Sequence, residues 1–341
     1  MSRYSIEQKF KSVAAFLIIL VLFPYIVSVF VNGADFRKNE DDIFYIQVRV
    51  SDTEEADGII EINWTDYLAG ILALEMPGDY ELEALKAQAV VVRTQIYRSM
   101  ENSADEEKSA DKEDASDKVL DGEFLTREDM QDKWGAQKGN SYYEKYVRAV
   151  EETDDTVLMY GDTCAWTPFH QSSNGMTRSA EEVVGSQDFP YVAVRECPLD
   201  KEADEEIQIF RFSYEEIQTL CREFLVAANS DEEARQGYGF SDFEITSYDS
   251  AGYVNQMRIG NTVCTGDRFR DALSLPSSSF TLSEADADEL QITTTGKGHG
   301  LGMSIWTAEQ MAEEGKTYDE ILAFFFDGTE LKNDIQETTL F

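Results

Sequence analysis

The stretch 67–100, YLAGILALEMPGDYELEALKAQAVVVRTQIYRSM, most constrains the fold because its pattern requires two helices with a sharp break between them. Its first half is an apolar run with helical spacing. A helix capped by Thr65 or Asp66 is therefore predicted to run to about Met76, where a proline-glycine pair begins at Pro77 and stops it.

Glu75 stands out in this stretch as a carboxylate on an apolar helix face. It lies four positions after Ile71 and three after Leu72, so the three side chains share one face. Partial desolvation raises the pKa of a carboxyl group, as a general acid near neutral pH requires. An ordinary surface glutamate in a last helical turn is the alternative, because the chain has 67 acidic residues.

The second helix is predicted from Glu83 to about Met100, and one of its faces carries two cations. The face is formed by Lys86, Val90, Arg93 and Tyr97, at positions i, i+4, i+7 and i+11. The two cations are candidates for a clamp on an anionic or hydroxyl-rich ligand, or for pairing with Glu75. A solvated stripe is the alternative, and Gln88 lies off this face.

The chain has two histidines, and both lie in loops rich in glycine or serine. His170 is in FHQSSNGMT (169–177), and His299 is in GKGHGLGMS (296–304). Glycines allow the backbone to approach a ligand closely, so we expect both loops to meet Glu75 at one cleft. A structural role for either histidine, holding its own loop, is the alternative. The second loop lacks the lysine and Ser/Thr ending of a phosphate-binding loop.

An uncharged apolar run at 13–31 follows Arg3, Lys9 and Lys11. It is long enough for a bilayer core, which needs roughly 20 apolar residues. The predicted organisation is a cytoplasmic segment 1–12, a transmembrane signal-anchor 13–31, a linker 32–42 and a large domain outside the cytoplasm. A long signal peptide cut near Gly33-Ala34 is the alternative.

The net charge of −38 excludes a general nucleic-acid binder, which needs a basic footprint. Four widely spaced cysteines, Cys164, Cys197, Cys221 and Cys264, leave disulfides and free buried thiols both open. No zinc pattern is present, and a two-carboxylate glycosidase remains possible on chemistry alone.

The predicted fold class is α+β, with mixed sheets and helices in two lobes around a substrate groove and one amino-terminal transmembrane helix. The acidic segment 101–118 is predicted to be a disordered insertion. Expected strands are 43–50, 58–64, 156–160, 164–169, 207–212, 243–249, 253–259 and two within 280–294, and later helices are 141–151, 214–228, 267–273, 303–314 and 318–326.

Three ordered motifs resemble the stage II sporulation protein D family. They are YLAGILALEMP…ELEALKAQAVVVRT (67–94), FHQSSNGMTRSAEEVVG…PYV (169–192) and GKGHGLGMSIWTAEQMAEEGKTYDEILAFFFDGTEL (296–331). The resemblance covers a domain at 43–331, which leaves a carboxy-terminal tail at 332–341.

The resemblance implies a membrane-anchored lytic transglycosylase that cleaves peptide-stripped peptidoglycan strands during engulfment in sporulation. Implied partners are a cell-wall amidase and a multi-pass membrane anchor protein. The matched motifs place the catalytic glutamate at Glu75, and place substrate-binding residues at Lys86, Gln88, Arg93, His170, Ser172, Ser173 and His299. No cofactor is implied.

Two departures from the family pattern weaken part of this analogy. Some members carry a His/Cys zinc cluster after the second helix, but residues 95–163 contain neither histidine nor cysteine, so no metal is carried over. The third motif usually reads MSQ, whereas this chain has Ile305 in place of the glutamine. A non-catalytic module that enhances a wall amidase is therefore the alternative function, and a wall-binding scaffold is a third.

Overall fold

The computed structural model describes residues 44–50, 58–109, 119–203, 206–225, 237–286 and 288–333, with the side chains of 103–109 and 286 excepted. Ile46–Phe341 form one compact unit. The predicted segments 1–12, 13–31 and 32–42 lie outside the described residues. No helix among the residues described is long and apolar enough to cross a membrane.

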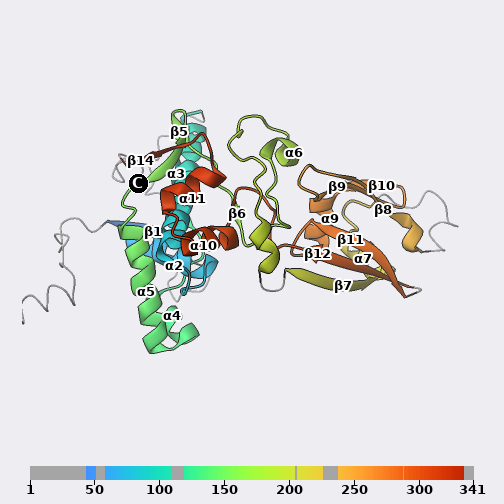
Figure 1. Cartoon of the computed structure of the whole chain (residues 1–341), viewed down its shortest axis with the longest axis horizontal. Helices are drawn as coiled ribbons and strands as arrows, with labels where there is room; N and C mark the ends of the chain where they lie inside the picture. Colours follow the sequence, from blue (N-terminus) through green and yellow to red (C-terminus); the bar gives the residue numbers. More distant parts are fainter. Residues whose placement is uncertain are drawn as a thin grey trace, which may run out of the picture. The chain divides into compact units, whose positions relative to one another are not determined.

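The described chain mixes helices with several small sheets, which confirms the α+β class (Figure 1). The helices are α2 (Trp64–Glu75), α3 (Leu82–Ser109), α4 (Arg127–Trp134), α5 (Ala136–Glu151), α6 (Ala180–Val184), α7 (Tyr214–Leu220), α9 (Gly266–Leu273), α10 (Ile305–Glu313) and α11 (Tyr318–Phe325). The strands are β1 (Tyr45–Arg49), β2 (Ile59–Asn63), β3 (Val119–Asp121), β4 (Val157–Tyr160), β5 (Thr163–Cys164), β6 (Phe169–His170), β7 (Ile207–Ser213), β8 (Phe243–Tyr248), β9 (Val254–Ile259), β10 (Thr262–Thr265), β11 (Phe280–Asp286), β12 (Glu289–Thr295), β13 (Met303–Ser304) and β14 (Glu330–Lys332).

Helix α3 contacts α2, α5, α10 and α11, and its residues 84–94 are all buried. Small and β-branched side chains from Ala84 to Val92 let its neighbours pack closely. Helix α2 begins where the Asn63 side chain accepts a hydrogen bond from the Asp66 backbone N–H. It ends at Glu75, before an extended Met76 and Pro77, as the sequence predicts.

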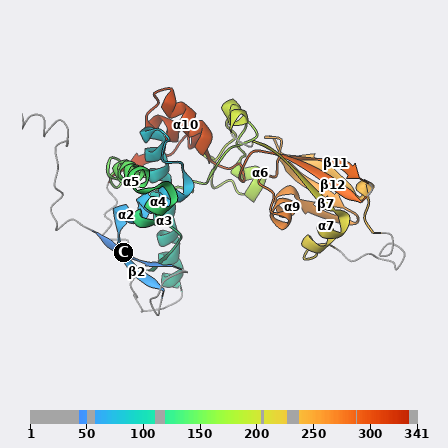
Figure 2. The same cartoon turned by 90° about the horizontal axis from the view of Figure 1, so that it is seen from below.

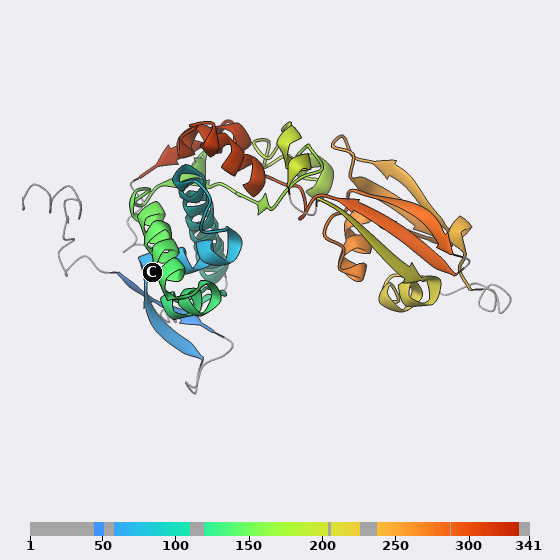
Figure 3. The ribbon, with the colours of Figure 1, turned by 60° about the horizontal axis from the view of Figure 1, so that its bottom comes forward.

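The segment 207–295 has its own hydrophobic core. Strands β7, β12 and β11 form one antiparallel sheet, and β8, β9 and β10 form another (Figures 2 and 3). The core between these elements includes Ile217, Met257, Phe269 and Ile292. The predicted hairpin around Ser250-Ala251-Gly252 is present as β8 and β9.

Three sequence-based boundaries need correction. Helix α3 continues to Ser109, because residues 101–109 include three glutamates, an alanine and a lysine, all good helix formers; only 110–118 of the predicted insertion lie outside the described residues. The expected strand 164–169 is divided, since Thr167 packs on α3 and donates to the Val91 carbonyl. Helix α7 ends at Leu220, well before 228.

Two glutamates join the starts of helices that are distant in sequence. Glu309 on α10 accepts a hydrogen bond from the Glu81 backbone N–H (2.7 Å), beside the first turn of α3. Glu83 on α3 accepts one from the Tyr318 N–H (2.9 Å), at the start of α11. Helix amino ends favour such carboxylates. The first bond therefore fixes the end of the loop 77–81 against α10, and the second fixes the start of α11 against α3.

Replacing Glu309 with glutamine is expected to stabilise the protein at pH 8 and not at pH 5. Burial raises the pKa of Glu309 to about 7, above its ordinary value in the unfolded chain. Its contribution to stability is therefore present at low pH and lost as pH rises through 7. Because the ionised carboxylate keeps its hydrogen bond from the Glu81 N–H, we expect a gain at pH 8 of only about 1–2 kcal/mol.

Urea unfolding of both proteins at the two pH values measures this difference. The exposed Glu330→Gln is the matched control and is expected to change stability equally at both values. A difference between native and Glu309→Gln protein that does not vary with pH would contradict the prediction.

Candidate active site

Glu75 is the last residue of α2, and its side chain is partly buried. Burial raises the pKa of its carboxyl group. A helix carboxyl end also disfavours negative charge, which acts in the same direction. Among the described residues, no hydrogen bond or ion pair is made to this carboxylate. Both effects favour the protonated form that a proton donor needs.

The second motif approaches Glu75 through Gln171, whose side-chain amide donates to the Glu75 carbonyl oxygen (2.9 Å). The third motif approaches the second: the Lys297 N–H donates to the Ser172 carbonyl (2.9 Å), and the Trp306 N–H donates to that of Gln171 (3.0 Å). The three motifs thus meet in space, as the sequence predicts.

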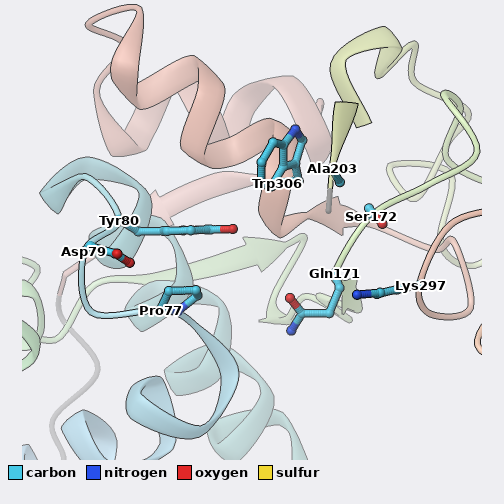
Figure 4. Close-up of a pocket in the computed structure, with 8 residues that line it drawn as sticks. All are labelled: Pro77, Asp79, Tyr80, Gln171, Ser172, Ala203, Lys297 and Trp306. Carbon is cyan, nitrogen blue, oxygen red and sulfur yellow. The ribbon is translucent and has the colours of Figure 1, made fainter. Parts of the chain in front are cut away.

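A hollow of about 390 Å³ lies where the motifs meet. Figure 4 shows the rings of Tyr80 and Trp306 facing it, with Gln171 and Lys297 on another side. The Trp306 indole N–H is fixed by a bond to the Leu199 carbonyl (3.0 Å). The lining residues are Pro77, Asp79, Tyr80, Gln171, Ser172, Ala203, Lys297 and Trp306. Glu75 precedes Pro77 by two residues, and its carbonyl oxygen accepts from the lining residue Gln171.

His170 and His299 lie together, with ring centroids 5.9 Å apart. Nδ1 of His170 lies 3.1 Å from the Leu301 carbonyl oxygen, and Nδ1 of His299 accepts from the Leu301 N–H (3.0 Å). Burial lowers the pKa of each to about 4, so both are neutral at pH 7. Their contacts support the structural alternative, in which they hold the glycine-rich loop.

Gly298 explains why this loop needs glycine beside His170. Its φ of +119° is unfavourable for other residues, and a Cβ there would lie 2.6 Å from the Cβ of His170. The close approach brings the second and third motifs into direct backbone contact.

Ser172 and Ser173 are buried and bind two carboxylates that the sequence analysis missed. The Ser172 hydroxyl donates to Glu206 (2.9 Å), and the Ser173 N–H donates to Asp200 (2.6 Å). Asp200 also accepts from Ser304, the residue that caps α10 (2.8 Å). Asp200 lies just after Cys197-Pro198, outside the quoted motifs, so no local pattern marks it.

The two cations of the predicted clamp, Lys86 and Arg93, do not line this hollow. Arg93 is 1% exposed and donates to the carbonyls of Val150 (3.2 Å) and Thr156 (3.0 Å), so it holds the end of α5. Lys86 pairs with Glu83 (2.7 Å) and Glu152 (2.6 Å) rather than with Glu75. The helix face on which they lie is covered by α5.

Gln88 is fully buried, and its amide has no hydrogen-bond partner among the described residues. Ile305, at the position where the family usually has glutamine, is also fully buried at the start of α10. The apolar side chain therefore fits the core there. All four cysteines are free and buried, and the described part of the chain has no cluster of three potential metal ligands.

Comparison with known proteins agrees with this geometry. A family model described as "Stage II sporulation protein" matches residues 52–160. The chain is 30% identical to stage II sporulation protein D of Bacillus subtilis over 267 residues, covering 78% of this chain and 73% of that protein. It is 29% identical to the Bacillus amyloliquefaciens protein of the same name, over 78% of this chain and 73% of the relative.

A more distant relative is the amidase enhancer of Bacillus subtilis, which is 24% identical over 77% of this chain and 40% of its own length. The two proteins named stage II sporulation protein D match a larger share of their own lengths, and both do so at higher identity. The protein therefore belongs to the stage II sporulation protein D family.

Proposed function

We propose that this protein is a membrane-anchored lytic transglycosylase that cleaves peptide-stripped peptidoglycan strands during engulfment in sporulation. The observation that carries the proposal is the Glu75 carboxyl group, partly buried and with a raised pKa, in a residue bonded to Gln171 of a polar and aromatic hollow. A lone acid of this kind suits a reaction in which one group acts first as acid and then as base.

In the proposed reaction, protonated Glu75 gives its proton to the glycosidic oxygen, and the bond from that oxygen to C1 of the muramic sugar breaks. Positive charge develops at C1. The C6 hydroxyl of the same sugar then bonds to C1 and gives its proton to the Glu75 carboxylate. The acid is restored, and neither water nor a second carboxylate takes part, unlike in the usual hydrolase pair.

The hollow supplies the positioning that this reaction needs. The rings of Tyr80 and Trp306 offer flat surfaces for sugar rings, and Gln171, Ser172 and Lys297 offer polar groups. Positioning of reacting groups is a major part of catalysis, and Gln171 is held against Glu75 itself. We therefore assign strand binding to these residues rather than to Arg93 and Lys86.

The proposed location follows from the apolar run 13–31, which would anchor the protein with its large domain outside the cytoplasm. Proposed partners are a cell-wall amidase, which would supply stripped strands, and a multi-pass membrane protein of the engulfment complex. Crosslinking in sporulating cells tests both associations.

A second candidate function is a non-catalytic module that enhances a wall amidase. The likeness to a protein named amidase enhancer favours it. Unlike the leading proposal, it requires no reaction at Glu75.

Product analysis separates the two functions. The full-length chain, kept soluble in mild detergent, is incubated with peptide-stripped strands, and the products are analysed by mass spectrometry. We expect 1,6-anhydro-muramyl ends, which are lighter by one water than hydrolysis products. Reducing ends would indicate hydrolysis. No products from stripped strands, together with faster turnover of intact peptidoglycan by an added amidase, would establish the enhancer instead.

A further inference from the structure

A second hollow, of about 400 Å³, adjoins the same two chain segments that line the first. Its lining residues are Asn174, Lys201, Glu206, Ile207, Ser279 and Thr295. Ser172 and Lys297 line the first hollow. Asn174 lies two residues after Ser172, and Thr295 lies two residues before Lys297. Because Ser172 and Lys297 are hydrogen bonded, the hollows are neighbours along one crossing of the chain.

Glu206 links the two hollows, and within the described part of the chain only one of its two carboxylate oxygens has a hydrogen-bond partner. The residue is 6% exposed, and its Oε2 accepts from the Ser172 hydroxyl (2.9 Å). Its Oε1 is buried and has no hydrogen-bond partner among the described residues. A buried polar atom without a partner is costly, so it indicates that a ligand or water completes the site.

Lys201 is positioned over this hollow by close packing. Gly175 has a φ of +105°, and a Cβ at this residue would lie 2.5 Å from the Cε of Lys201. The missing side chain at Gly175 therefore gives the lysine stem its place. Lys201 is exposed in a chain with a net charge of −38. A positive charge at this hollow therefore points to an anionic group in the ligand.

We infer that this second hollow is a glycan subsite in which Lys201 binds the free lactyl carboxylate of a muramic sugar. The inference rests on the proposed function and names a further specificity residue for it. A stem peptide converts that carboxylate into a neutral amide, which removes the negative charge that Lys201 recognises. The subsite therefore gives a physical reason for a preference for peptide-stripped strands.

The surrounding charges are compatible with an anionic ligand. Burial raises the pKa of Glu206 to about 7, so part of it is neutral at that pH. That value includes the effect of Asp200, which raises the pKa, and that of Lys297, which lowers it and adds a second positive charge near the crossing. Ser279 and Asn174 contribute a hydroxyl and an amide, which are hydrogen bonded to each other (3.0 Å).

The test measures binding, not cleavage, in a Glu75→Gln background of the full-length chain. Two ligands are compared at low salt: peptide-stripped strands, and the same strands with their carboxylates converted to methylamides. Lys201→Glu is the test variant, and Lys332→Glu, an exposed change of the same charge, is the control.

Lys201→Glu is expected to weaken binding of the acidic strands by about tenfold, as loss of a charge-assisted hydrogen bond predicts. It should leave binding of the amidated strands unchanged, and Lys332→Glu should leave the ratio of the two affinities unchanged.

An equal loss of affinity for both ligands in Lys201→Glu would overturn the subsite. Equal affinity of the parent protein for acidic and amidated strands would overturn it too. In either case strand binding and cleavage would still support the proposed function. Failure of the parent protein to bind any strand would overturn both proposals together.

Discussion

Replacing Glu75 with glutamine is expected to lower the rate of glycan cleavage by about a thousandfold, within the range that general acid–base catalysis contributes. Glutamine keeps the size and polarity of the side chain, but it has no proton to give and cannot take one from the C6 hydroxyl. Strand affinity should stay within about twofold of the native value, since the hollow itself is unchanged.

The measurement is the initial rate of anhydro-end formation, together with equilibrium binding of the same strands. The exposed Glu144→Gln in α5 is a matched control and should cleave at the native rate. Retention of a tenth or more of the native rate in Glu75→Gln would contradict the assignment of Glu75 as the acid.

The native protein should also lose its proposed activity as pH rises through the pKa of Glu75, because the ionised carboxylate cannot start the reaction. Burial raises this pKa, so the loss should occur above the pH range in which an exposed glutamate ionises.

The sequence predicted those parts of the site that depend on local chain geometry. Apolar spacing and Pro77 correctly located the end of α2 at Glu75. Paired strands in the segment 243–259 were also found, because alternation and the glycine turn are local signals. The meeting of the three motifs came from their resemblance to the family and from the close approach that glycines permit.

The role of Arg93 was not predictable from helix spacing. Periodicity places Lys86 and Arg93 on one helix face, but it does not say what covers that face. Helix α5 covers it and offers the Val150 carbonyl as a partner. The same pattern therefore suits a ligand clamp and a buried structural contact equally, and only tertiary packing decides between them.

Asp200 and Glu206 were missed for a related reason. In a chain with 67 acidic residues, two more carboxylates carry no local signal. They differ from the others in being buried against Ser172 and Ser173, and burial depends on segments far apart in the sequence.

Replacing Arg178 with methionine is expected to destabilise the protein by about 3–5 kcal/mol, the usual cost of leaving one partner of a buried ion pair uncompensated. The Arg178 Nε donates to Asp249 (2.7 Å), and these two side chains are 3% and 2% exposed. Its Nη1 donates to Asp267 (2.9 Å) and to the His299 carbonyl (3.2 Å). Methionine preserves the apolar stem but leaves Asp249 charged and buried.

Urea unfolding at pH 7 measures the loss, with the exposed Arg211→Met on β7 as the control. Adding Asp249→Asn to Arg178→Met should recover part of the stability, because the unpaired charge is removed; the two changes then cost less together than their sum. A loss below about 1 kcal/mol in Arg178→Met would contradict a buried pair of this importance.

The same replacement tests whether Arg178 links the second and third motifs. Its backbone N–H donates to the Gly300 carbonyl (2.7 Å), and its guanidinium donates to the His299 carbonyl. One residue therefore fixes the glycine-rich loop at two points. Amide hydrogen exchange in residues 296–302 should therefore accelerate in Arg178→Met by more than global destabilisation explains. Equal acceleration throughout the protein would mean that Arg178 contributes stability alone and does not position the loop beside Glu75.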